Sequence, residues 1–595
     1  MKQEIRQRIA RLRDEMKSHG IDAVIIPQSD PHHSEYLAGH WQLRRFLSGF
    51  TGSAGTLVVT QDDAALWTDS RYFLQAADQL DGTDIVLMKE GVEDTPSIAD
   101  FLTGSLGDGK TVGIDGMLFS INDTDELRGN LGKKGINLDV SFNVADKVWP
   151  ERPSLPDDKI FIHEEKFAGR SASDKIAEVM KNVHSQGADA VFISALDEIA
   201  WTLNIRSSDV ESNPVAMAFL YLSHEGSTLF VNERKVTPEI IEYLSQAEID
   251  TVPYNGVEPF LRNIPDDRRV LVSVTQSAGA LLPILGRRTV TGTSPVAGPK
   301  SIKNDTQVKG IRNAMVRDGV ALVKAFMEIE DAITDKRCLT ETGIATILTK
   351  HRSRQELYFD QSFDTIAGWG AHGAIVHYSA NKNTDATIEG DNLLLIDSGA
   401  NYLDGTTDIT RTIAIGTPTE EQRRDFTLVM KGHIALATAI FPKGTRGGQI
   451  DCLARQYLWQ EGKTYLHGTG HGVGHFLNVH EGPQRISLLD NTAPLAAGMV
   501  TSNEPGLYRT GMYGIRCENL MLTVPAMTTE FGEFLRFETL TLFPFDLSLF
   551  DTSIMSDVEI DWVNNYHTRV REHLSPLLDA REKAWLDMHT APLSR

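Results

Sequence analysis

Cysteine is scarce in this sequence, and long apolar runs are missing from it. Only three of the 595 residues are cysteine (Cys338, Cys452 and Cys517), and none forms a CxxC motif. This usage argues against a disulfide-held secreted protein and favours a reducing compartment, so a cytoplasmic location is expected. No run of about 18 apolar residues occurs, so no membrane-spanning helix is predicted.

Positive charge is also in short supply. The chain carries 81 acidic and 58 basic residues, a formal net charge of -23, and no long basic run offsets it locally. A surface of this sign repels a phosphate backbone and an anionic bilayer, so neither nucleic acid nor a membrane is an expected partner. The N-terminal stretch spaces Ile5, Ile9, Leu12 and Met16 as in an amphipathic helix, and it lacks the apolar core of a signal peptide.

The length and two similar segments predict several domains. Single hydrophobic cores stop growing at about 250–300 residues, well short of this chain. The segments "GIDAVIIPQSD" (20–30) and "GADAVFISALD" (187–197) resemble each other, which indicates a repeated domain. Proline-rich stretches at 148–158 and 291–301 mark linkers. The expected domains are therefore 1–150, 155–300 and 302–595.

The third part mixes clear helices with strands. In "GTPTEEQRRDF", Thr417 stands three residues before Glu420 and predicts a capping box at a helix start. "DNLLLIDSGANY" and "DITRTIAIG" are predicted strands. Helices and hairpins of this kind favour an α+β or mixed α/β fold over a regular doubly wound sheet.

Two aspartates stand where an apolar strand ends. Asp397 closes the run "LLLID", and Asp408 follows eleven residues later. A turn at Asp404-Gly405 is expected to fold the chain back so that the two carboxylates meet. Taken alone, they are equally well explained as solvated polar groups at a strand edge and as cation ligands.

Histidines and glutamates further along the chain favour the cation-ligand explanation. "HGTGHGVGHFLNVHEGP" holds His467, His471, His475 and His480 among glycines, a pattern that packing does not explain and that lacks the GK[ST] of a phosphate loop. Glu504 and Glu518 lie in or beside apolar strands, where a lone glutamate is disfavoured.

Four carboxylates and one imidazole suit two divalent cations such as manganese, cobalt or zinc. Two such cations bridged by carboxylates turn a bridging water into hydroxide near neutral pH, so the constellation predicts metal-assisted hydrolysis.

These residues resemble the metallopeptidases of the pita-bread fold, a family that includes methionine aminopeptidase, prolidase and aminopeptidase P. The resemblance rests on the two aspartates, "HGTGHG", "NEPG" and "IRCEN", and further stretches such as "SGFTGSAGT", "LWTDSRYFLQAA" and "WVNNYH" extend it over the whole chain. It implies two related N-terminal creatinase-like domains before a C-terminal pita-bread catalytic domain. The implied metal ligands are Asp397, Asp408, His471, Glu504 and Glu518.

The resemblance also implies roles around the metals. Glu504 would act as general base and acid, and Arg516 would steady Glu518. His377 would bind substrate and move a proton to the scissile nitrogen, His480 would support the carbonyl oxygen, and His467 would line the proline-side subsite. Two positions depart from the family pattern: Ala380 stands where proline is common, and His475 adds an imidazole.

Two long N-terminal domains resemble the three-domain form of aminopeptidase P. The implied activity is removal of the first residue from peptides with proline second, through a dinuclear metal-bridged hydroxide, in a homodimer that most often uses manganese. An Xaa-Pro bond lacks the amide N–H on which a protease groove usually relies, and a metal site can attack its carbonyl without that group. Two alternatives stay open: a prolidase that requires a dipeptide, and a non-catalytic scaffold, from which metal ligands would have been lost.

Overall fold

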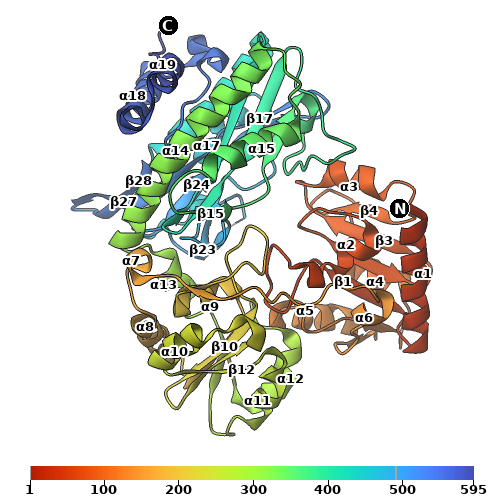
Figure 1. Ribbon diagram of the computed structural model, residues 1–595. Helices are drawn as coiled ribbons and strands as arrows, with labels where there is room; N and C mark the ends of the chain where they lie inside the picture. Colours follow the sequence, from red (N-terminus) through yellow and green to blue (C-terminus); the bar gives the residue numbers. More distant parts are fainter. Residues whose placement is uncertain (1, 490–491) are drawn as a thin grey trace. The chain divides into compact units, whose positions relative to one another are not determined.

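The computed structural model describes residues 2–489 and 492–595, which fold into two compact units (Figure 1). The first unit comprises the chain up to Glu165 together with Arg170–Ala297. The second comprises Lys166–Gly169 and Gly298–Arg595. Within the described residues, no helix combines the length and the apolar character needed to cross a bilayer.

The first unit contains two six-stranded sheets with the same topology. Their strand orders are β4-β3-β2-β1-β5-β6 and β12-β11-β10-β8-β13-β14, and the parallel and antiparallel pairs occupy equivalent places in both. The first sheet comprises β1 (Ala23–Pro27), β2 (Thr56–Thr60), β3 (Ala64–Thr68), β4 (Val86–Lys89), β5 (Thr111–Gly113) and β6 (Asn137–Asp139). The second comprises β8 (Ala190–Ile193), β10 (Ala218–Ser223), β11 (Ser227–Val231), β12 (Ile249–Pro253), β13 (Val270–Ser273) and β14 (Thr289–Gly292). The predicted relationship between the two N-terminal domains is confirmed.

The two similar sequence segments enter these sheets in the same way. Helix α1 (Lys2–Ser18) is followed by Gly20 and then β1, and helix α8 (Ala172–Ser185) is followed by Gly187 and then β8. Both glycines adopt positive φ, 69° and 77°, a left-handed conformation that glycine adopts without a steric penalty. This shared helix stop explains why the two segments resemble each other in sequence.

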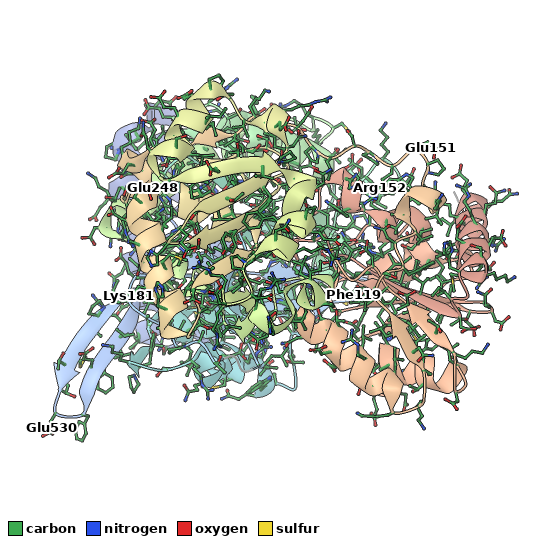
Figure 2. The ribbon with its side chains drawn as sticks, turned by 90° about the horizontal axis from the view of Figure 1, so that it is seen from below. Phe119, Glu151, Arg152, Lys181, Glu248 and Glu530 are labelled. Atoms are coloured by element: carbon green, nitrogen blue, oxygen red, sulfur yellow. The ribbon has the colours of Figure 1, made fainter. Side chains whose placement is uncertain are left out.

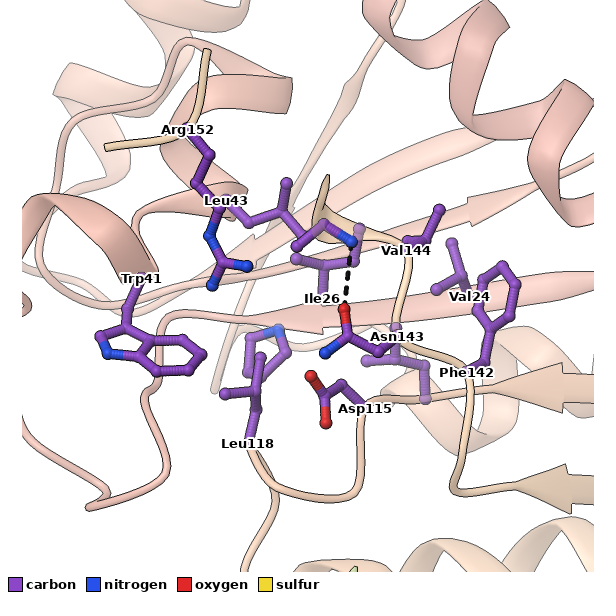
Figure 3. Close-up of a pocket in the computed structure, with 13 residues that line it drawn as sticks. Val24, Ile26, Trp41, Leu43, Asp115, Leu118, Phe142, Asn143, Val144 and Arg152 are labelled. Atoms are coloured by element: carbon purple, nitrogen blue, oxygen red, sulfur yellow. Dashed lines mark hydrogen bonds between the residues drawn. The ribbon is translucent and has the colours of Figure 1, made fainter. Parts of the chain in front are cut away.

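The proline-rich segment after the first sheet is held against that sheet's domain. The Arg152 guanidinium donates a hydrogen bond from Nε to the carbonyl of His40 (2.7 Å), and it lies 4.9 Å from the ring of Trp41. The ring of His40 in turn contacts the carbonyl of Pro153 at 2.6 Å. Arg152, Asp115 and Asn143 line a small cavity of about 20 Å³ (Figure 3), which is room for a single water molecule.

The second unit is built from antiparallel sheets and long helices. Every strand pair in its described part is antiparallel, which confirms the α+β prediction. The largest sheet has the order β21-β28-β27-β24-β22-β23, and a smaller one the order β16-β17-β20. The strands of these two sheets are β16 (Ile366–Trp369), β17 (Asn392–Ser398), β20 (Ile409–Ile415), β21 (Ile440–Pro442), β22 (Gly470–Gly472), β23 (Glu481–Ile486), β24 (Val500–Asn503), β27 (Asn519–Thr529) and β28 (Gly532–Thr539). The helices are α14 (Asp305–Thr334), α15 (Glu341–Arg352), α16 (Glu420–Ala437), α17 (Gly447–Trp459), α18 (Asp557–Leu574) and α19 (Ala580–His589).

Two local predictions in this unit need correction. Helix α16 is capped by Thr419, whose side chain pairs with Gln422 in a capping box, and not by Thr417. The segment predicted as one strand over "DNLLLIDSGANY" divides at Gly399 into β17 and β18 (Ala400–Tyr402), which belong to different sheets. A side chain at Gly399 would come within 2.1 Å of the carbonyl oxygen of Thr407, so glycine is needed at this break.

The long hairpin of β27 and β28 turns near Glu530, which points away from the rest of the sheet in Figure 2. At its other end, β27 begins with Asn519, immediately after Glu518. One end of this hairpin is therefore exposed, and the other delivers a candidate ligand into the interior.

The turn between the two aspartates is fixed by helix α14. β18 and β19 (Gly405–Thr406) pair Tyr402 with Gly405, so the turn residues are Leu403 and Asp404, one position earlier than predicted. The Asp404 carboxylate forms an ion pair with Arg317 of α14. Gly405 instead provides a close approach, since a Cβ there would lie 3.0 Å from the Cα of Ile311.

Gly310→Ala tests this close approach. A Cβ at Gly310 would come 2.3 Å from the carbonyl oxygen of Asp404, so helix and turn must separate. We expect the free energy of unfolding to fall by about 1–3 kcal/mol, measured by urea denaturation. Gly298→Ala, where no atom lies within 4 Å of the new Cβ, is the control and should leave it nearly unchanged.

Candidate metal centre

The two aspartates come together through an antiparallel strand pair. β17 and β20 pair Ser398 with Ile409, and Asp397 and Asp408 adjoin this end of the pair. Both residues are buried, at 8% and 3% exposure. The strand register thus places Asp397 near enough to Asp408 to raise the pKa of its carboxyl group.

The two glutamates are placed by a second strand pair in the same way. β24 and β27 pair Asn503 with Asn519, so Glu504 leaves one strand where Glu518 enters the other. The Glu518 amide donates to the carbonyl of Thr410 (3.1 Å), and the Thr410 hydroxyl donates to the Glu518 carboxylate (2.7 Å). Thr410 belongs to β20, so these bonds join the glutamate pair to the aspartate pair.

His471 supplies the imidazole. It lies in β22, and its Nδ1 contacts the carbonyl of Gly472 at 3.0 Å, which assigns the proton to Nδ1. Its Nε2 lies 3.5 Å from an oxygen of Asp408 and 3.4 Å from an oxygen of Glu504. A backbone carbonyl that holds the far nitrogen of a histidine is the usual way to orient such a ligand toward a metal.

These side chains form a donor set that fits a divalent cation. Ligand atoms of Asp408, His471 and Glu518 lie within 4.8 Å of one another. Asp397 Oδ1 is buried and has no hydrogen-bond partner among the described residues. A buried carboxylate oxygen without a donor is costly, and a cation among oxygen ligands would remove that cost.

Electrostatics support the same conclusion. Burial, with the added repulsion of Asp397 and Glu504, raises the pKa of Asp408 well above its usual range. Burial and the carboxylates of Asp408 and Asp397 do the same to the pKa of Glu518. Burial also raises the pKa of Glu504 to about 7, partly offset by Arg516. Without more positive charge than Arg516 supplies, Asp408, Glu504 and Glu518 cannot all ionise at neutral pH, and divalent cations would supply that charge.

The raised pKa values predict how metal stabilises the protein at different pH. Because the folded metal-free chain binds these protons more tightly than the unfolded chain, its free energy of unfolding should fall as pH rises from the ordinary carboxyl range toward about 7. Metal must displace the same protons, so its stabilising effect should increase with pH. We expect manganese to raise the melting temperature more at about pH 7.5 than at about pH 5.5. An equal increase at both values would contradict the assignment.

Arg516 is hydrogen-bonded to the cluster and to two hydroxyl groups beside it. It donates to Asp397 (2.6 Å), to the Tyr508 hydroxyl (2.8 Å) and to the Thr410 hydroxyl (3.2 Å). Its expected support of Glu518 is thus indirect and passes through Thr410. The Tyr508 hydroxyl also contacts His467 Nε2 at 2.8 Å, so His467 is linked to the cluster through Tyr508 and Arg516.

The remaining predicted histidines differ in how closely they approach the cluster. The ring of His480 lies 4.3 Å from that of His471 in an edge-to-face arrangement, and its charge affects the pKa of both Asp408 and Glu504. His377 is half-buried and follows the short helix η6 (Gly370–Ala374), which packs against the strand that carries Arg516. His475 is buried in the loop after β22, and Ala380 packs beside Tyr378.

Three supporting residues escaped the sequence-based prediction. Thr410 and Tyr508 are described above. The third, Glu341, is a buried carboxylate that accepts hydrogen bonds from the Tyr378 hydroxyl (2.8 Å) and the Trp369 amide (2.8 Å), and thereby holds the loop that carries His377. Thr410 stands two residues after Asp408, so in an extended chain both side chains are expected on the same face. This spacing was the one signal in the sequence that could have identified Thr410, since contacts between strands cannot be read from a single sequence.

An α+β unit that places four carboxylates at the ends of two strand pairs, with an imidazole beside them, has the features of a metal-dependent hydrolase. The family model described as "Metallopeptidase family M24" matches residues 309–525, and the model described as "C-terminal region of peptidase M24" matches residues 533–593. "Creatinase/Prolidase N-terminal domain" matches twice, at 8–143 and 151–307. The chain belongs to metallopeptidase family M24.

Similar proteins span the whole chain. A "Probable Xaa-Pro aminopeptidase P" of Aspergillus fumigatus is 41% identical over 99% of this chain and 93% of its own length. "Aminopeptidase P2" of Arabidopsis thaliana is 41% identical over 97% of this chain and 86% of its own. The solved X-prolyl aminopeptidase of Caenorhabditis elegans, described as a cytosolic enzyme with a di-nuclear active site, is 35% identical, with a TM-score of 0.93 over 96% of this chain and 95% of its own.

Proposed function

We propose that this protein is an Xaa-Pro aminopeptidase that removes the first residue of peptides whose second residue is proline. The observation that carries the proposal is that two strand pairs end beside Asp397, Asp408, Glu504 and Glu518, with His471 of β22 within 3.5 Å of Asp408 and Glu504 oxygens. Full-length similarity to proteins named Xaa-Pro aminopeptidase supports the substrate class.

The five residues would hold two divalent cations, of which manganese is the first choice and zinc or cobalt the others. Bound cations would offset the carboxylate charge and lower the pKa of an attacking water molecule toward neutrality. Arg516 and Thr410 hold Asp397 and Glu518 in place by hydrogen bonds to their carboxylates, so the donor set is preorganised.

The chain's own side chains then divide the proton transfers. Glu504, as the carboxylate beside the attacking water, takes the proton of that water. His480 stands beside His471 and donates toward the substrate carbonyl oxygen as negative charge develops there. His377 assists delivery of the proton to the leaving proline nitrogen, and His467 lines the side of the pocket that receives proline.

A peptide panel tests the substrate class. Metal-stripped protein is reloaded in turn with manganese, zinc or cobalt and given an Xaa-Pro-Pro tripeptide, the Xaa-Pro dipeptide and an Xaa-Ala-Pro control. Release of the first residue from the tripeptide alone is the expected result. The missing amide hydrogen separates both proline peptides from the Xaa-Ala-Pro control, and the dipeptide separates an aminopeptidase from a prolidase. Preference for the dipeptide would indicate a prolidase instead, and no cleavage with any metal would favour a binding scaffold.

We also propose a cytoplasmic homodimer. The cytoplasmic location rests on the low cysteine content and on the description of the Caenorhabditis elegans relative as cytosolic. The dimer rests on family resemblance. Light scattering coupled to size exclusion should give twice the chain mass of 65.8 kDa, and a monomer mass would contradict the dimer.

A further inference from the structure

A buried carboxylate next to His480 is held by two lysines. Glu481 accepts a hydrogen bond on Oε2 from the ammonium of Lys300 (2.5 Å), and its Oε1 forms an ion pair with Lys303. The three side chains are 0%, 3% and 1% exposed, respectively. We call this group the lysine clamp. None of its members belongs to the five predicted metal ligands.

The lysines come from the short segment that leads into helix α14. Lys300 lies in α13 (Ala297–Ser301), and Lys303 immediately precedes Asn304, the N-cap of α14. The Lys303 amide also donates to the carbonyl of Gly498 (2.9 Å), and Ile302 forms a β-bridge with Met499, just before β24. The same segment therefore contacts the strand that leads to Glu504 as well as the carboxylate beside His480.

Glu481 lies beside the candidate centre in two directions. It follows His480 in the chain, and across the sheet it pairs with Gly472, the neighbour of His471. The strands run so close here that a Cβ on Gly472 would come 2.5 Å from the Glu481 carbonyl oxygen. Any rotation of the Glu481 backbone would therefore move His480 relative to His471.

The two lysines bind different oxygens of one buried carboxylate. Buried ions cost free energy through desolvation, so a buried ion group of this kind is weak evidence for added stability. Two donors on different oxygens prevent the carboxylate from rotating, which fixes the chain at this point.

We propose that the lysine clamp of Lys300, Glu481 and Lys303 positions His480 for catalysis. The inference rests on the proposed aminopeptidase function and makes the three clamp members positioning residues that act through His480. Catalytic groups must be held to within a fraction of an ångström, and a displacement of about 1 Å costs up to a hundredfold in rate. The clamp supplies this restraint from a segment remote in sequence.

A double-mutant cycle between the clamp and His480 tests the proposal. In manganese-loaded enzyme acting on an Xaa-Pro-Pro peptide, Lys303→Met should lower kcat about tenfold and change KM by less than about twofold. Bound manganese per chain, measured by mass spectrometry, should stay at the wild-type value. In the His480→Ala background the same substitution should have no further effect on kcat, because its route of action has been removed.

Two further variants keep the test decisive. Lys300→Met, which leaves the pair of Lys303 with Glu481 intact, should repeat the result if Lys303→Met does not fold. Lys431→Met breaks the ion pair of Lys431 with Glu559, a largely buried pair of the same unit, and should lower the melting temperature with kcat within about twofold of wild type.

The outcomes separate the clamp from the function on which it rests. If the losses from Lys303→Met and His480→Ala multiply in the double variant, the clamp does not act through His480 and the inference is wrong, although the enzyme remains an aminopeptidase. If wild-type protein does not cleave the proline peptide with any metal, the proposed function fails and the inference fails with it.

Discussion

Asp408→Asn is expected to abolish metal binding and peptide hydrolysis together. The asparagine keeps the size of the side chain but removes the charge that holds a cation beside His471 and Glu518. Loss of a ligand at this position should lower kcat/KM for an Xaa-Pro-Pro peptide by about a thousandfold or more. Bound metal per chain should fall in parallel, measured by mass spectrometry on dialysed protein.

Asp404→Asn is the matched control for that substitution. Asp404 lies in the same stretch and is also buried, but its carboxylate pairs with Arg317 of α14 and not with the cluster. We expect a loss of about 1–3 kcal/mol in the free energy of unfolding, with kcat/KM within about threefold of wild type. Full activity in Asp408→Asn, or a comparable loss of metal in both variants, would contradict the site assignment.

Glu504→Gln is expected to separate proton transfer from substrate binding. The amide preserves volume and one oxygen but cannot accept the proton of the attacking water, so kcat should fall by about 10²–10⁴-fold while KM changes little. At least one cation per chain should be retained, since the other candidate ligands are untouched. Stopped assays on Xaa-Pro-Pro peptides give both kinetic constants.

Glu533→Gln serves as the control here, because Glu533 lies on the hairpin of β27 and β28 and forms an exposed ion pair with Lys443, which follows β21. That variant should keep kcat within about twofold. A Glu504→Gln enzyme with wild-type kcat would rule out the general-base role.

The sequence was sufficient to predict those parts of the site whose residues lie in short motifs. Carboxylates in or beside buried strands, such as Asp397 in β17 and Glu518 just before β27, are unfavourable unless a cation or a donor holds them, so they indicate a site. The repeated helix, glycine and strand at Gly20 and Gly187 likewise predicts the duplicated sheet, since positive φ after a helix restricts the residue in both places.

Features that depend on packing between distant segments were not predictable. Two threonines precede helix α16, and both can cap; Thr419 is selected because Gln422 completes its capping box. Gly405 was predicted to be a turn residue. In the structure it allows helix α14 to pack closely against the chain, and no local sequence pattern predicts where that helix lies. Arg516 is close to Glu518 in sequence, but the strand geometry aims it at Asp397.

The central claim is that a centre of two metal ions in this cluster removes the residue before proline. Its most direct test is the initial rate of Xaa-Pro-Pro hydrolysis by metal-stripped protein as manganese is added back, plotted against manganese bound per chain. The account predicts almost no activity without metal and a rate that continues to increase until two ions are bound. Full activity in metal-free protein, or a rate that no divalent metal restores, would contradict it.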